Sequence, residues 1–172
     1  MKYELDSINL KEIIGYSIQS EEKSKQFYKK FVETGKGKLV VERFRTLMDE
    51  EQLHKETLLE LHEKLYGNRN YDIPDNDNLP PHEDFESLRQ VENLIDALEK
   101  AITNENNAIR IYEYVAGEYE EYSDLFHYLA AMEHGHYESL KREKGLYERG
   151  AETTGQDEFS GGIWKNLGLE GF

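Results

Sequence analysis

Four long stretches of the sequence carry apolar residues at the spacing of one helix face, and residues that end helices bound each stretch. They span residues 8–34, 38–66, 87–118 and 123–147. Only Gly35 to Gly37 separates the first two, so these helices must lie antiparallel. Residues 67–87 contain all three prolines and predict an irregular crossover. The pattern therefore predicts an all-α antiparallel four-helix bundle with one long crossover.

The length of 172 residues suits a single domain with one core. We expect the bundle to occupy residues 1–150, with its last helix ending near Tyr147, because the glycines that follow disfavour a helix. Residues 151–172 would form a Gly-rich C-terminal tail with a short apolar segment around Trp164. This tail either packs on the protein or a dimer mate, or it is a docking peptide for a partner or a shell.

Charge and composition exclude several classes of function. The formal net charge of -15 opposes binding to phosphate backbones, so we expect no nucleic-acid partner. The chain has no cysteine, which excludes disulfides, thiolate metal sites and cysteine nucleophiles. No stretch resembles a signal peptide or a membrane-spanning helix, so we expect no membrane association and a cytoplasmic location.

Each apolar stripe contains a carboxylate where a core is normally apolar. Glu21 lies seven residues after Ile14 and seven before Tyr28, so these side chains share one face. In the second stretch, His54 follows Glu51 by three residues on the same face. The inward-facing polar residues come from all four stretches: Glu21, Glu51, His54, Glu105, Glu133 and His136.

The two halves of the chain repeat this arrangement. Tyr28 follows Glu21 by seven residues, as Tyr112 follows Glu105. In both halves the second glutamate has Leu four residues before it, His three residues after it and Leu seven residues after it. This internal repeat predicts a site with approximate two-fold symmetry.

Charge balance indicates that metal ions occupy the site. Four ionised carboxylates in a core would cost several kcal/mol each without compensation. Two divalent cations would neutralise them, with the two imidazoles uncharged. Oxygen and nitrogen ligands without sulfur fit iron or manganese, and zinc also fits in vitro.

These residues resemble the ligand set of the ferritin-like di-iron carboxylate superfamily, and rubrerythrin-like proteins within it. The resemblance covers roughly residues 8–147 and implies two iron ions per chain. It implies that Glu51 and Glu133 bridge the two metals and that Glu21 and Glu105 are terminal carboxylates. It also implies that His54 and His136 each bind one metal. Tyr28 and Tyr112 match aromatic positions beside the cluster, from which they would hydrogen-bond ligand carboxylates.

The resemblance also implies an activity. The activity is that of an oxidoreductase that reduces hydrogen peroxide or dioxygen in the response to oxidative stress. The resemblance also implies a homodimer. Rubrerythrins commonly carry a Cys-rich rubredoxin module, which this chain lacks, so electrons would come from a separate donor such as a rubredoxin-like protein. They also carry a further Glu where this chain has Ala108, which weakens the case for peroxidase chemistry.

Two other functions remain open. One is ferritin-like Fe(II) oxidation with iron storage or handling, which a six-ligand set without the further Glu would suit. The other is an interaction module that bound metal stabilises.

The remaining histidines have no partner set in the sequence. We expect His62, His82 and His127 to be structural, and His134 to face solvent or an interface. Gly135, in the middle of a predicted helix, marks either a close helix contact or access to the metals.

Overall fold

The computed structural model describes residues 5–34, 38–74, 78–81 and 94–154. Its long helices are α1 (Leu10–Thr34), α2 (Lys38–Tyr66), α3 (Leu94–Glu118) and α4 (Ser123–Thr154). Short 3-10 helices occupy Leu5–Ser7 and Glu120–Tyr122. The described residues contain no strand, and the predicted all-α four-helix bundle is confirmed.

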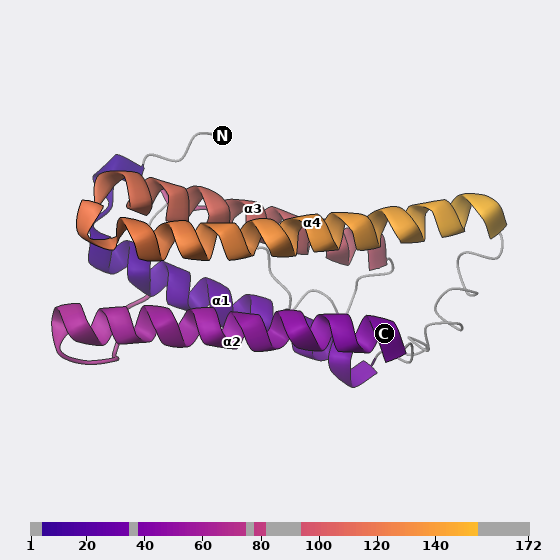
Figure 1. The fold of residues 1–172 in the computed structure, drawn as a ribbon, viewed down its shortest axis with the longest axis horizontal. Coiled ribbons are helices and arrows are strands. Elements are labelled where there is room, and N and C mark those ends of the chain that lie inside the picture. The colour runs from indigo at the N-terminus through magenta and orange to yellow at the C-terminus, as the bar shows by residue number, and fades with distance from the viewer. Residues whose placement is uncertain (1–4, 35–37, 75–77, 82–93, 155–172) are drawn as a thin grey trace.

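The bundle consists of two helical hairpins that pack side by side. Helix α1 packs against α2 and helix α3 against α4, and α1 also contacts α3. Figure 1 shows that each hairpin is antiparallel, whereas α2 and α3 run in the same direction. The connection from α2 to α3 therefore crosses the length of the bundle, as predicted.

Local sequence signals fix the ends of the first two helices. The Asn9 side chain accepts a hydrogen bond from the backbone N–H of Glu12 at 3.0 Å, and Glu12 accepts one from the backbone N–H of Asn9 at 3.2 Å. This capping box starts α1 at Leu10, two residues after the predicted start. Gly67 has a φ of 76° and ends α2, as its sequence position predicted.

The described parts of the crossover are irregular and pack on the first half of α1. The Tyr16 hydroxyl donates a hydrogen bond to the carbonyl oxygen of Pro80 at 2.9 Å, and Leu79 is buried in the core. A Cβ atom at Gly15 would lie 2.4 Å from the carbonyl oxygen of Asp72, so only glycine allows this close approach. The predicted start of the third helix at Ser87 lies outside the described residues.

Helix α4 is longer than the sequence predicted. It continues past Tyr147 to Thr154, so the predicted end was wrong. The single Gly150 costs only about 1 kcal/mol in a helix, and good helix formers surround it. Residues 151–154, the start of the predicted tail, are therefore helical. The glycines that predicted the end begin at Gly155, and residues 155–172 lie outside the described residues. The domain boundary at residue 150 stays a prediction.

Two apolar clusters fill the core, one toward each end of the bundle. One includes Ile14, Leu58 and Leu129, and the other includes Phe44 and Leu140. On every helix the inward-facing glutamate lies, in sequence, between the residues of the two clusters. Packing at both ends thus holds the polar side chains at mid-bundle. No helix in the described part of the chain is long and apolar enough to cross a membrane.

Candidate metal centre

The structure brings together all six residues predicted from the sequence. One carboxylate comes from each helix, and the two imidazoles come from α2 and α4. All six side chains belong to residues that are at most 3% exposed: Glu21, Glu51, His54, Glu105, Glu133 and His136. Ionisable groups this deeply buried need partners or bound cations.

The Nδ1 atom of each histidine faces the carboxylates. His54 Nδ1 lies 2.7 Å from Glu133 Oε1, 3.6 Å from Glu51 Oε2 and 3.8 Å from Glu21 Oε2. His136 Nδ1 lies 3.2 Å from Glu133 Oε2 and 3.4 Å from Glu51 Oε1. The two rings are stacked, with centroids 5.4 Å apart.

The four carboxylates therefore fall into two kinds. Glu51 and Glu133 each have one oxygen near His54 and the other near His136. Glu21 lies near His54 only, and Glu105 lies near His136 only, with its Oε2 3.8 Å from Nδ1. The same division separates the bridging from the terminal carboxylates that the resemblance implied, and these roles toward metal stay predictions.

Two tyrosines link the hairpins reciprocally. Tyr28 of α1 donates a hydrogen bond to Glu105 of α3, and Tyr112 of α3 donates one to Glu21 of α1. All four residues are buried. Both hydrogen bonds were expected from the sequence, and their exchange between hairpins gives the site the approximate two-fold symmetry that the internal repeat predicted.

Burial and mutual repulsion raise two of the carboxyl pKa values. Burial, followed by repulsion from Glu133, raises the pKa of Glu51 well above its ordinary value. Burial and Glu133 also raise the pKa of Glu105 to about 8. For Glu21, burial alone would raise the pKa, but the nearby Glu51 and His54 and the hydrogen bond from Tyr112 together lower it. Burial and the charge of Glu21 would also raise the pKa of Glu133, but the nearby Glu105, His136 and His54 together lower it.

Burial acts on the pKa of an imidazole in the opposite sense, because it disfavours the charged, protonated form. Burial would lower the pKa of His54, but the nearby carboxylates, led by Glu133, raise it to about 12. The pKa of His136 is raised for the same reason, led by Glu105. Without bound cations, these directions favour charged imidazoles beside Glu21 and Glu133, and protons retained on Glu51 and Glu105.

The donor atoms fit a pair of metal ions. Both oxygens of Glu51, Oε1 of Glu133 and Nδ1 of each histidine are buried and have no hydrogen bond. One ligand atom from each of Glu51, His54, Glu133 and His136 can lie within 4.8 Å of the others. Buried groups without hydrogen-bond partners are costly, and cations shared among them would satisfy their lone pairs. The assignment of the six residues as ligands stays a prediction.

The outer nitrogens of the histidines break the symmetry. His136 Nε2 lies 3.0 Å from Glu50 Oε2, whereas His54 Nε2 is buried with no hydrogen-bond partner. Sequence reasoning missed Glu50. The signal was present, because Glu50 precedes Glu51 whereas Met132 holds the matching position before Glu133.

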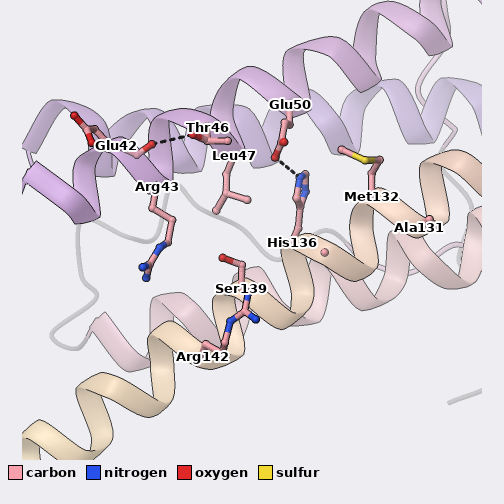
Figure 2. Close-up of a pocket in the computed structure, with 11 residues that line it drawn as sticks. Glu42, Arg43, Thr46, Leu47, Glu50, Ala131, Met132, His136, Ser139 and Arg142 are labelled. Carbon is pink, nitrogen blue, oxygen red and sulfur yellow. Dashed lines mark hydrogen bonds and ion pairs between the residues drawn. The ribbon is translucent and has the colours of Figure 1, made fainter.

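A pocket of about 520 Å³ between α2 and α4 reaches the outer edge of His136. Arg43, Ser139 and Arg142 line it, and Figure 2 shows Glu50 and His136 joined across it. Gly135 also lines the pocket, and a Cβ atom there would meet no atom within 4 Å. Gly135 thus makes no close helix contact and borders open space beside the site.

Among the remaining histidines, His62 and His134 agree with the predictions, whereas the structural role expected for His127 stays a prediction. His62 is fully buried, and its Nδ1 lies 2.8 Å from the carbonyl oxygen of Asn68, which fits a structural role. His134 is exposed and lies 3.5 Å from Glu113, and His127 is exposed. His82 lies outside the described residues.

Comparisons with known proteins agree with this geometry. A protein-family model described as Rubrerythrin matches residues 12–144, a range that contains all six predicted ligands. A solved structure of a hypothetical protein from Pyrococcus furiosus is similar, with a TM-score of 0.68 and 27% identity. That match covers 83% of this chain and 92% of the other. No curated protein matches the sequence.

Proposed function

The chain belongs to the rubrerythrin family, and from this premise we propose that it is a di-iron oxidoreductase that reduces hydrogen peroxide or dioxygen with electrons from a separate donor. The observation that carries the proposal is the placement of Glu51 and Glu133, each of which has one oxygen beside each histidine. Such carboxylates can hold two metal ions close together.

The buried oxygen and nitrogen donors fit iron, and also manganese or zinc. When bound, two ferrous ions supply the two electrons that convert hydrogen peroxide and two protons into two molecules of water. The protein's contribution is to place the ligands and to exclude bulk water. The apolar clusters at both ends of the site perform the second task.

The tyrosines would orient the terminal carboxylates. Burial, followed by the charge of Glu105, raises the pKa of Tyr28 well above its ordinary value, and burial with Glu21 does the same for Tyr112. Both hydroxyls therefore keep their protons and remain hydrogen-bond donors at neutral pH. Each fixes one carboxylate oxygen and leaves the other directed at the cluster.

The electrons need an outside source. The chain contains no cysteine for an iron–sulfur or rubredoxin-type centre. A separate donor, such as a rubredoxin-like protein, is therefore part of the proposal. A homodimer in the cytoplasm and a role in oxidative stress remain further parts of it.

A second candidate function is the oxidation and handling of Fe(II). The observation in its favour is Ala108, which lies one helical turn after Glu105 and is buried in the apolar cluster. A carboxylate at that position belongs to the peroxidase-type members that the chain resembles, and this chain has a methyl group there.

Rapid mixing separates these functions. Protein loaded with two Fe(II) per chain is mixed with hydrogen peroxide or with dioxygen, and the oxidation of iron is followed by absorbance. The proposal expects oxidation by at least one of them and renewed reduction by an added donor. If excess Fe(II) is instead oxidised and many iron atoms remain with each assembly, iron storage is the function. Tight zinc without redox activity would favour the interaction module.

A further inference from the structure

The two halves of the site differ at one position of the repeat. Around each bridging carboxylate the repeat is closely kept, with Leu, Glu, His and Leu at the same spacings. Immediately before that glutamate, α2 has Glu50 and α4 has Met132. A thioether is uncharged and only a weak hydrogen-bond acceptor, so it is a much poorer partner for an imidazole N–H than a carboxylate.

The contact made by Glu50 settles which nitrogen of His136 faces the cluster. A carboxylate oxygen accepts hydrogen bonds, so the contact at 3.0 Å favours a proton on His136 Nε2. Once a cation displaces the other proton, the lone pair lies on Nδ1, the atom that faces Glu51, Glu105 and Glu133. The carboxylate also makes the imidazole a stronger donor to metal.

His54 has no such support. Its Nδ1 faces the cluster in the same way, but its Nε2 is buried without a hydrogen-bond partner among the described residues. Within this part of the chain no acceptor holds the proton on Nε2, and the N–H must give up its hydration without a replacement. Binding of metal through His54 is therefore less favourable than binding through His136.

We propose that Glu50 is a positioning residue that orients His136 for metal and makes the two metal positions unequal, so that the position beside His136 fills first. The proposal rests on the metal binding in the proposed function, but it does not depend on the reaction. Glu50 is partly exposed, with 34% of its side chain accessible, and lies at the pocket between α2 and α4. The carboxylate that supports the buried ligand is thus reached from outside.

The test measures binding of Zn(II) to the metal-free full-length protein by calorimetric titration. Wild-type protein should show two unequal steps. Glu50→Ala should weaken the tighter step by about 10–100-fold, the range for losing a partner of a ligand histidine. Glu50→Gln keeps an acceptor oxygen and should lose less than Glu50→Ala. Asp49→Ala, the matched control, removes a charge from the exposed neighbouring residue and should leave both steps within about 2-fold of wild type.

Anomalous diffraction from crystals with one equivalent of zinc identifies the position that fills first. The proposal expects higher occupancy beside His136, and a reduced difference in Glu50→Ala. Equal occupancy in wild type, preference for the His54 side, or equal effects of Glu50→Ala and Asp49→Ala would overturn it. If zinc does not bind at the cluster at all, the metal-site assignment fails with it. If zinc binds as expected but iron-loaded protein reacts with no oxidant, only the proposed reaction fails.

Discussion

Tyr28 on α1 donates its hydroxyl proton in a hydrogen bond to Glu105 on α3, so that a side chain of one hairpin holds a predicted ligand of the other. The reverse bond, from Tyr112 to Glu21, makes the dependence mutual. In each hairpin, the tyrosine that hydrogen-bonds the terminal carboxylate belongs to the other hairpin. The site can therefore form only when the two hairpins pack together.

Removing either hydroxyl should weaken both the fold and the site. Tyr28→Phe and Tyr112→Phe should each lower the free energy of unfolding by about 1–2 kcal/mol, because each leaves a buried carboxylate without a donor. Each should also weaken metal binding by about 10-fold. Denaturant titration and metal titration measure these losses. Tyr128→Phe, at a 51% exposed position, is the control and should change neither. A loss in only one of the two site variants would contradict the mutual support.

Two glycine substitutions should have opposite signs. Gly135→Ala should stabilise the protein by about 0.5–1 kcal/mol, because the added methyl enters open space and alanine is the better helix former. Gly15→Ala should destabilise it by about 1–3 kcal/mol, because the methyl would meet the Asp72 carbonyl oxygen at 2.4 Å. Thermal unfolding of the metal-free variants measures both. Equal shifts would show that helix propensity alone governs these positions.

Metal binding should release protons and strengthen as pH rises. The raised pKa values favour a proton on each imidazole, on Glu51 and on Glu105, whose pKa is about 8. Metal ligands must lose these protons, so loading two divalent ions should release protons, up to about four per chain. For each displaced proton, the affinity for metal should rise about tenfold per pH unit. The rise ends at the pH where the group has already lost its proton in protein without bound metal. Calorimetry in buffers of different ionisation enthalpy counts the protons. Release of none would contradict the protonation pattern.

The ion pair between Arg43 of α2 and Glu143 of α4 should stabilise the bundle beyond the site. Glu143 is only 3% exposed, whereas 43% of the Arg43 side chain is accessible to solvent. Arg43→Met leaves a buried carboxylate without its cation and should cost about 1–2 kcal/mol, less than a fully buried pair would. Arg142→Met removes the same charge from the same pocket and serves as the control. Equal effects in denaturant titration would assign the loss to net charge.

The sequence predicted the parts of the molecule that depend on helical periodicity. The four apolar stripes and the helix-ending Gly67 predicted where the helices lie. The inward-facing carboxylate on each stripe predicted the position of the site. The predicted end of α4 was wrong, because the helix tolerates the single Gly150 and continues to Thr154. Glu50 was missed because its partner His136 lies on another helix, and helical periodicity alone does not indicate that contact. The one signal was the difference between Glu50 and Met132 in the internal repeat.

We infer that the six buried side chains hold two metal ions. Anomalous diffraction at the iron edge, from crystals of protein loaded with two equivalents of Fe(II), locates bound iron without assumptions about the ligands. We expect two iron peaks per chain, one beside Nδ1 of His54 and one beside Nδ1 of His136, with Glu51 and Glu133 between them. Iron bound elsewhere, or a mid-bundle site without peaks after loading, would contradict it.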